Sequence, residues 1–375
     1  MNVREKLDLL SADSQYDLAC ACGTGRDRRR RSVDGSKWLY PVPMTSGGFG
    51  IMFKTLMTNA CGNDCRYCPL RSRGNAARCR VTPEEVVGTF LDYHRRMGLY
   101  GIFLSSGVPD TPDRAMEPLI AAAEMLRRRE HFRGEVHLKI IPGASEAAIL
   151  EAMRYASSVS LNIEVPGKSH FEKLSEAKDF ERDIVRPLKF MTSRAAAGEG
   201  RRRVKTTTQF IVGASDETDA EIVRYMDGLY NRLKMNRIYF SAYQQGLGDP
   251  AIPGEQHRFD LSDGRDRLTR EHRLYQVDFL LRKYNFAPSE LVFESDGQLD
   301  LKFDPKERWA QAHPAFFPLR LKSADREALL RVPGLGPVYV SRILKTRREN
   351  TLRSLADIGL VGVNAMKAAS YLDFS

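Results

Sequence analysis

The stretch NACGNDCRYCPLRSRG, residues 59–74, contains three of the six cysteines of the chain, Cys61, Cys65 and Cys68. Three residues separate the first pair and two separate the second, and no fourth cysteine completes the run. The Gly-Asn-Asp sequence between the first two cysteines permits a tight turn that brings the thiols together. The preceding segment, IMFKTLMT at 51–58, is typical of a buried strand. We therefore expect three thiols on one loop directly after a strand.

Three thiols on a short loop suit an iron–sulfur cluster. A cubane cluster has four irons held by thiolates, so three cysteines leave one iron open to an external ligand. Tyr67 offers an aromatic face beside that position. A structural zinc site, the alternative, needs four ligands. Cys79 lies eleven residues beyond Cys68 and is expected to be a packed thiol, while Cys20 and Cys22 are either incidental or line the site.

Strand-like and helix-like segments alternate along the chain from about residue 50. The expected strands cover residues 51–58, 100–106, 135–141, 158–165, 206–213 and 236–243. Amphipathic helical sequence follows them; the first helix begins at Thr82, with Pro83 at the first helical position and Glu85 completing a capping box. Six such units predict an α/β fold with a parallel sheet, either a partial barrel or a doubly wound sheet. In barrels, functional groups lie on the loops after the strands, where the cysteine loop falls.

Composition and length indicate one large domain and a smaller one. The chain has 375 residues, of which 42% are hydrophobic and 28% charged. No apolar run reaches the roughly 20 residues of a membrane helix, so we expect a soluble cytoplasmic protein. The expected division is an N-terminal extension at 1–47, a barrel at 48–245, a connecting or lid segment at 246–318 and a small all-α domain at 319–375.

Positive charge is concentrated in short runs. The net charge is +10, with arginine runs at 28–31, 127–129 and 201–203. Residues 320–375 contain ten Lys and Arg against five Asp and Glu. Any single run is as easily a solvated face, but together the runs favour a polyanionic partner.

The segment ALLRVPGLGPVYVSRILKTRR, residues 328–348, is typical of two short helices joined by a glycine turn. Glycines at a helix N-terminus expose backbone N–H groups, which attract anions. Residues 354–372 look like a degenerate second copy. The candidate phosphate-contacting residues are Gly334, Leu335, Gly336, Arg342, Lys345 and Arg347. The alternative is a helical hairpin used for packing or protein contact.

The cysteine loop resembles the signature of the radical SAM superfamily, Cys-x3-Cys-x-aromatic-Cys after the first strand of a partial barrel. The resemblance implies a partial (β/α)6 TIM-like barrel and a [4Fe–4S] cluster on Cys61, Cys65 and Cys68. S-adenosylmethionine would bind the fourth iron. An electron from a donor such as flavodoxin or ferredoxin would cleave it to methionine and a 5′-deoxyadenosyl radical, which takes a hydrogen atom from the substrate.

Further positions match the superfamily and imply contacts with S-adenosylmethionine. The segment 105–107 occupies the place of a glycine-rich segment that meets the amine, although it reads Ser-Ser-Gly. Asn162 and Glu164 lie where the superfamily contacts the ribose or carboxylate; polar packing inside the barrel is the alternative. QFIVGASDET resembles the adenine segment, with Gln209 in place of its first glycine. The implied cofactor contacts are Tyr67, Ser105, Ser106, Gly107, Asn162, Glu164, Ile211 and Gly213.

The C-terminal segment resembles the helix–hairpin–helix motif, which binds DNA phosphates without reading bases. The whole chain resembles a family of radical SAM proteins described as DNA modification or repair enzymes, found beside a uracil-DNA glycosylase-like partner. This implies a radical SAM enzyme acting on DNA. Three alternatives stay open: a radical SAM enzyme for RNA, a peptide or a small molecule, with the hairpins as a docking module; a non-catalytic DNA-binding iron–sulfur protein; and a zinc-stabilised DNA-binding protein.

Overall fold

The computed structural model describes residues 1–14, 33–44, 47–199, 204–256, 265–350 and 352–375. These residues form two compact units. Unit 1 comprises Met1–Glu217 and Tyr225–Glu271, and unit 2 comprises Thr218–Arg224 and His272–Ser375. Cys20, Cys22 and the arginine runs at 28–31 and 201–203 lie outside the described residues. The predicted connecting segment at 246–318 is divided between the two units at residue 271.

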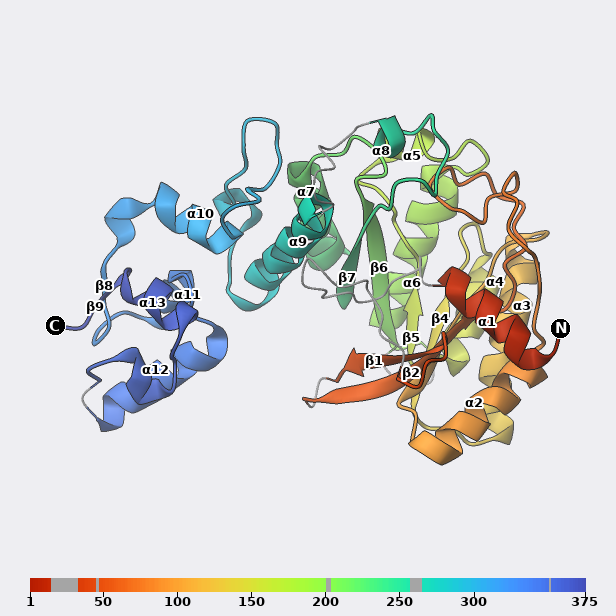
Figure 1. Cartoon of the computed structure of the whole chain (residues 1–375), viewed down its shortest axis with the longest axis horizontal. Coiled ribbons are helices and arrows are strands. Elements are labelled where there is room, and N and C mark those ends of the chain that lie inside the picture. Colours follow the sequence, from red (N-terminus) through yellow and green to blue (C-terminus); the bar gives the residue numbers. More distant parts are fainter. Residues whose placement is uncertain (15–32, 45–46, 200–203, 257–264, 351) are drawn as a thin grey trace. The chain divides into compact units, whose positions relative to one another are not determined.

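Unit 1 is built on a seven-stranded sheet in which each strand neighbours the next one along the chain (Figure 1). The strands are β1 (Leu39–Pro43), β2 (Phe49–Leu56), β3 (Gly101–Ser105), β4 (Glu135–Lys139), β5 (Ser158–Ser160), β6 (Lys205–Val212) and β7 (Arg237–Ala242). Strands β2 to β7 pair in parallel, and β1 is antiparallel to β2. A doubly wound sheet would reverse its strand order at a switch point, whereas this order is sequential. The predicted partial barrel is confirmed as a curled half-barrel.

Two features of the sheet differ from the prediction. Strand β5 is three residues long, because the chain leaves the ladder before Glu164, whose φ is +66°. Strand β1 was not expected from its sequence, LYPVP. Its two prolines cannot donate to a ladder, and such a strand is tolerated at the edge, where β1 lies.

Helices and short helical turns connect the strands of unit 1. They are α2 (Pro83–Met97), α3 (Pro112–Glu124), α4 (Glu146–Tyr155), α5 (Lys168–Glu172) and α6 (Arg186–Ala196), with α8 (Pro253–Gln256) further on and short π-helical segments η2 (Met125–Arg129), η3 (Phe180–Val185) and η4 (Gly228–Arg232). Helices α7 (Asp219–Asp227) and α9 (Arg265–Lys283) have residues in both units. Helix α2 has the predicted capping box, in which the Glu85 N–H donates to the Thr82 hydroxyl at 3.2 Å and the Thr82 N–H to the Glu85 carboxylate at 2.9 Å.

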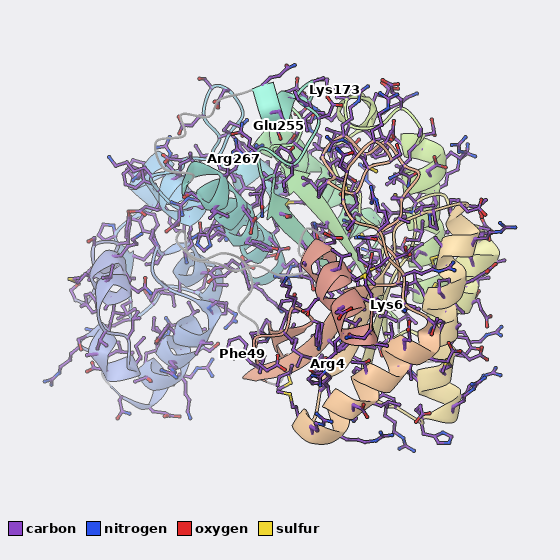
Figure 2. The ribbon with its side chains drawn as sticks, turned by 45° about the vertical axis from the view of Figure 1, so that its right-hand side comes forward. Arg4, Lys6, Phe49, Lys173, Glu255 and Arg267 are labelled. Carbon is purple, nitrogen blue, oxygen red and sulfur yellow. The ribbon has the colours of Figure 1, made fainter. Side chains whose placement is uncertain are left out.

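An N-terminal helix, α1 (Val3–Asp13), packs against β2. Leu7 and Leu10 of this helix are fully buried. Lys6 forms an ion pair with Glu85 of α2 at 2.7 Å, and Figure 2 shows Lys6 on the side of α1 that faces α2. The first 13 residues are therefore part of the barrel unit rather than a free extension.

Unit 2 is mainly helical. It contains α10 (Pro305–Ala312), α11 (Arg326–Arg331), α12 (Pro337–Glu349) and α13 (Val363–Ala369), the 3-10 turns η5 (Pro288–Glu290), η6 (Pro314–Phe316) and η7 (Leu355–Ile358), and strands β8 (Leu319–Arg320) and β9 (Leu372–Asp373), which pair in parallel. Its core includes Leu329, Leu335, Val340 and Ile343. None of the helices within the described ranges is long and apolar enough to cross a membrane.

Candidate functional site

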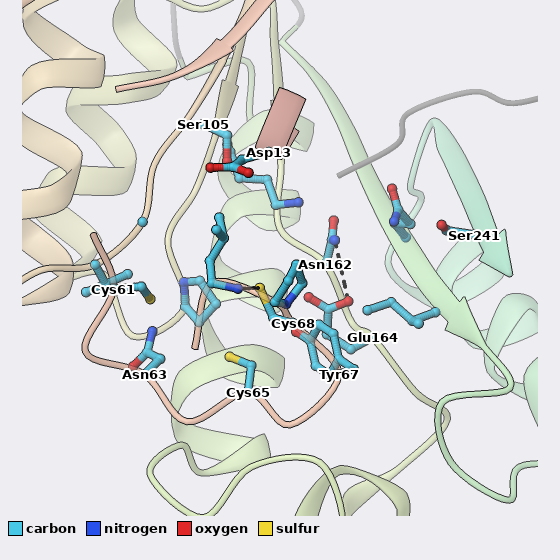
Figure 3. Close-up of a pocket in the computed structure, with 18 of the residues that line it drawn as sticks. Asp13, Cys61, Asn63, Cys65, Tyr67, Cys68, Ser105, Asn162, Glu164 and Ser241 are labelled. Atoms are coloured by element: carbon cyan, nitrogen blue, oxygen red, sulfur yellow. Dashed lines mark hydrogen bonds between the residues drawn. The ribbon is translucent and has the colours of Figure 1, made fainter. Parts of the chain in front are cut away.

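A cavity lies at the carboxyl ends of the parallel strands of unit 1 (Figure 3). Its empty volume, including space open to solvent, is about 1160 Å³. Ten predicted site residues line it: Cys61, Cys65, Tyr67, Cys68, Ser105, Ser106, Gly107, Asn162, Glu164 and Ile211. Gly213 does not; its N–H donates to the Glu217 carboxylate at 2.5 Å.

The cysteine loop is turned by its own backbone. The Gly62 N–H donates to the Val108 carbonyl at 2.7 Å, and the Cys68 N–H to the Cys65 carbonyl at 2.9 Å. The Leu70 N–H points at the Cys68 sulfur, 3.4 Å away. Burial, together with the neighbouring Cys65, raises the pKa of the Cys68 thiol to about 12. A metal that binds this thiol must therefore displace its proton, and the N–H to sulfur contact then favours the thiolate.

Arg78 stabilises the cysteine loop through hydrogen bonds to its backbone. Its guanidinium donates to four backbone carbonyls, those of Asn59, Leu70, Arg71 and Gly74, at 2.5 to 3.3 Å. These carbonyls come from both ends of the loop. Arg78 was not predicted as a site residue. Its position close to the cysteine cluster was the available signal.

Cys79 is a packed thiol, as expected. It does not line the cavity, and its sulfur lies 3.8 Å from the Lys6 carbonyl of α1. Its N–H donates at 2.8 Å to the side chain of the fully buried Asn59.

Asp64 ties the cysteine loop to the segment after α5. Its carboxylate accepts hydrogen bonds from the Ser175 hydroxyl at 2.5 Å, the Glu176 N–H at 2.7 Å and the Ala177 N–H at 3.1 Å. Partial burial alone would raise the pKa of Asp64, but these hydrogen bonds lower it below the ordinary value. Asp64 is therefore a charged anchor of the loop.

Lys178 follows this anchored segment and lines the cavity. Its ammonium donates to the Cys65 sulfur at 2.9 Å. Burial alone would lower the pKa of Lys178, but the nearby Cys65 and Glu164 raise it above the ordinary value. The positive charge of Lys178 therefore lies next to the sulfur of Cys65, one of the three predicted cluster ligands.

Gly107 packs against the start of the cysteine loop. A Cβ atom there would lie 2.3 Å from the Ala60 carbonyl oxygen and 3.1 Å from that of Thr58. The Gly107 N–H donates to the Thr58 carbonyl at 2.7 Å. Only glycine allows this approach, so the segment after β3 and the cysteine loop form one wall of the cavity.

Asn162 and Glu164 lie beside Tyr67 in the cavity (Figure 3). Glu164 has a left-handed φ of +66°, and its backbone bonds to β6 through the Gln209 carbonyl at 3.0 Å and the Ile211 N–H at 2.7 Å. Burial and the neighbouring Glu164 raise the pKa of Tyr67 well above its ordinary value, so the phenol stays protonated. A non-glycine residue held at positive φ costs on the order of 1–3 kcal/mol, and such strain is concentrated at functional sites.

A row of polar side chains forms the floor of the half-barrel. Lys139 of β4 is paired in register with Ser160 of β5, and Ser160 with Thr207 of β6, so the three side chains share one face. Lys139 lines the cavity, as does Gln209, two residues beyond Thr207 on the same face. The Ser160 and Thr207 hydroxyls and the Gln209 amide nitrogen are buried without a hydrogen-bond partner among the described residues.

Several of these cavity residues were not predicted. Lys139 carries charge in the mostly buried strand β4, and a lysine inside the apolar strand 135–141 was the available signal. Lys178 gave no such signal, because its neighbours Glu176 and Ala177 are exposed. Asp13 also lines the cavity and accepts a hydrogen bond from the Asn59 amide at 2.8 Å. No sequence signal pointed to Asp13, because α1 brings it to the cavity through tertiary packing.

The donor set fits a cubane cluster. The three thiols line a shared cavity. A cubane cluster binds each thiolate through a different iron, so it needs thiols that are spread over a surface.

Comparison with known proteins gives the class of the domain. Residues 55–229 match the model of the radical SAM superfamily. No curated protein matches the chain significantly. Solved structures that resemble it include methylornithine synthase (PylB), at 17% identity and a TM-score of 0.45, over 60% of this chain and 61% of that one. Others are HydG, a maturase of the [FeFe]-hydrogenase (15%, 0.44, 60% and 49%), and SuiB of Streptococcus suis (14%, 0.41, 60% and 45%). The chain thus spans about half to three fifths of the length of these structures.

The chain therefore contains a radical SAM superfamily domain at residues 55–229. Members of the superfamily use a [4Fe–4S] cluster and S-adenosylmethionine, which are the cofactors of this domain. Radical SAM enzymes commonly take their electron from a flavodoxin or ferredoxin.

Proposed function

We propose that this protein binds its cluster through Cys61, Cys65 and Cys68 and cleaves S-adenosylmethionine in the cavity beside them. One observation carries the proposal: a single cavity gathers the three thiols with Tyr67, the 105–107 segment, Asn162, Glu164 and Ile211, which come from separate parts of the half-barrel. The cluster, when bound, supplies the electron for reductive cleavage of the cofactor.

Different side chains would contact the cluster and the separate parts of S-adenosylmethionine. The thiols hold the cluster, and the wall made by Gly107 and the cysteine loop limits how far the cofactor can move. Asn162 and Glu164 offer polar contacts to the ribose or carboxylate, and Ile211 offers an apolar surface to the adenine. The buried side chains of Ser160, Thr207 and Gln209 in the half-barrel keep bulk water away from a radical.

The floor also indicates what the substrate presents. Gln209 lines the cavity, and its amide nitrogen is a hydrogen-bond donor that is buried without a partner among the described residues. Buried donors are normally paired, so we expect the substrate to bring oxygen acceptors such as carbonyl groups. Nucleobases that carry carbonyl oxygens meet this requirement.

We further propose that the substrate is DNA, with unit 2 as a helix–hairpin–helix module. Gly334 has a φ of +82° and packs so closely that a Cβ would lie 2.4 Å from the Asn364 carbonyl oxygen. Gly336 caps the 13-residue helix α12 without a side-chain hydrogen bond, which leaves N–H groups for a phosphate. Lys345 and Arg348 are exposed on the same helix.

Other predicted phosphate contacts have partners inside unit 2. Arg342 donates to the Ile358 carbonyl at 3.1 Å, and Arg347 to the Leu321 and Ala324 carbonyls at 3.2 and 2.6 Å. Leu335 belongs to the core. We therefore assign phosphate binding to the glycine turn, Lys345 and Arg348. The uracil-DNA glycosylase-like partner rests on the family resemblance alone and is proposed on that basis.

The test is formation of 5′-deoxyadenosine by anaerobically reconstituted, reduced protein. It is run without DNA, with a plain duplex and with a duplex that contains uracil. Formation that rises with a duplex supports DNA as the substrate. Formation that DNA does not change would keep the radical chemistry and reject DNA, and no formation with a verified cluster and reductant would reject the proposed reaction.

A further inference from the structure

Among the described residues, Lys178 donates a hydrogen bond from its ammonium to the sulfur of a predicted cluster ligand. It donates to Cys65 at 2.9 Å and lines the same cavity as all three cysteines. Two carboxylates also interact with it electrostatically, Glu164 in the cavity and Asp183 within η3. The lysine therefore interacts with the thiol loop and with two acidic groups.

The fold fixes the backbone on both sides of Lys178. On one side, residues 175–177 are bound by the Asp64 carboxylate, and the Leu174 carbonyl accepts the Arg66 N–H at 2.8 Å. On the other side, the Asp179 N–H donates to the Asp183 carboxylate at 2.8 Å. Ordering a free lysine side chain costs conformational entropy. Here the anchored backbone restricts the reach of the side chain before any cofactor binds.

A charge at this position affects the reduction of a cluster. The potential of an iron–sulfur cluster depends on hydrogen bonds to its sulfurs and on the surrounding charge. Reduction adds a negative charge to a cluster that its thiolates already make negative, so a nearby ammonium stabilises the reduced state more than the oxidised state. We propose that Lys178 is a positioning residue that holds Cys65 and raises the reduction potential of the cluster. The inference rests on the proposed assignment of the three cysteines as cluster ligands.

The experiment compares wild-type protein with Lys178→Met, which removes the charge, and Lys178→Arg, which retains it. Lys173→Met is the matched control: it lies five residues earlier, its ammonium pairs with Asp216 at 2.6 Å, and its side chain is 41% exposed (Figure 2). Each full-length protein is reconstituted anaerobically. Iron and sulfide per chain are measured, and the midpoint potential is determined by EPR-monitored titration without S-adenosylmethionine, which isolates the effect on the cluster from cofactor binding.

We expect Lys178→Met to shift the midpoint potential to a more negative value, while Lys178→Arg and Lys173→Met stay near wild type. If Lys178→Met folds but does not retain the cluster, retention by Lys178→Arg supports the same role for the charge. Equal potentials in fully loaded wild type and Lys178→Met would overturn the inference, as would loss of the cluster in both Lys178 variants. Wild-type protein that binds no iron would instead overturn the proposed function, so the two failures are distinguishable.

Discussion

The carboxylate of Asp64, inside the cysteine loop, accepts a hydrogen bond from the Ser175 hydroxyl at 2.5 Å. Ser175 is 111 residues further along the chain. The same carboxylate also accepts two backbone N–H groups from residues 176 and 177. The thiol loop and the segment that carries Lys178 are therefore fastened together before a cofactor arrives.

Asp64→Ala should loosen the cysteine loop and weaken retention of the cluster. Hydrogen bonds to a charged group contribute about 1.5–3 kcal/mol each to stability. Because Asp64 is partly exposed, we expect the loss of its three hydrogen bonds to cost a total near the lower end of their summed range. Iron retained per chain after desalting, together with urea unfolding, measures the effect. Asp110→Ala is the control, because Asp110 is half-exposed and pairs only locally with Arg114. Equal iron retention in both variants would contradict the role given to Asp64.

Gly107→Ala should disturb the wall between β3 and the cysteine loop. The added Cβ would meet backbone atoms of Ala60 and Thr58, which cannot move aside as a side chain does. We expect a loss of about 1–3 kcal/mol in the free energy of unfolding and weaker binding of S-adenosylmethionine. Gly88→Ala in α2 meets nothing within 4 Å and should be neutral or slightly stabilising. A Gly107→Ala protein that binds the cofactor as wild type does would argue against a close-packed wall.

The barrel could be predicted because its signals are local. Apolar strands alternate with capped amphipathic helices, and the Thr82 and Glu85 capping box placed the start of α2 correctly. Strand β1 could not be predicted, since its two prolines argue against a strand until an edge position is known. The short β5 depends on the left-handed backbone of Glu164, which tertiary contacts with β6 impose.

The glycine turn of unit 2 is closed by a buried lysine, which gives its stability a pH dependence. The Lys306 ammonium donates at 3.1 Å to the Leu330 carbonyl, which precedes the turn, and at 2.5 Å to the Leu335 carbonyl within it. Burial lowers the pKa of Lys306 to about 7, against 10.5 for an ordinary lysine. Between pH 7 and 10.5, Lys306 is therefore protonated in the unfolded chain and largely deprotonated in the folded chain. The free energy of unfolding of unit 2 should rise as the pH rises from about 7 towards 10.5.

The measurement is urea unfolding of the full-length chain between pH 6.5 and 9. The chain has two tryptophans, so a Trp38→Phe background leaves the buried Trp309 as the reporter of unit 2. Lys306→Met should flatten the pH dependence, and the exposed Lys302→Met should leave it unchanged. A pH dependence that is the same in the Lys306→Met protein would refute the lysine as its source.

Lys345→Ala combined with Arg348→Ala should weaken DNA binding equally for all sequences. Each lost phosphate contact makes the negative slope of log K for DNA binding against log salt shallower by about 0.9, so loss of both contacts should reduce its magnitude by about 2. Fluorescence anisotropy with a labelled duplex at several salt concentrations measures both effects. Arg347→Ala is the contrast, because its guanidinium binds the Leu321 and Ala324 carbonyls and its loss should reduce stability. Undiminished affinity of the double variant would remove these side chains from the interface.

The site was predictable only where chemistry requires a fixed spacing. The three cysteines are adjacent in sequence, so their proximity follows from the loop itself. Asp13 and Lys178 reach the cavity from segments far away in sequence, one through the packing of α1 and the other through the Asp64 anchor. Arg342 and Arg347 looked like surface charges in the sequence, and their internal carbonyl partners become visible only in the fold.

The most direct test of the central claim is cleavage of S-adenosylmethionine by three reduced, reconstituted proteins: wild type, Cys68→Ala and Cys79→Ala. Cys68 lines the cavity, whereas the Cys79 sulfur lies against the Lys6 carbonyl outside it. We predict 5′-deoxyadenosine from wild type and Cys79→Ala and none from Cys68→Ala. Cleavage by Cys68→Ala at the wild-type rate, or none by wild-type protein with a verified cluster, would contradict the account.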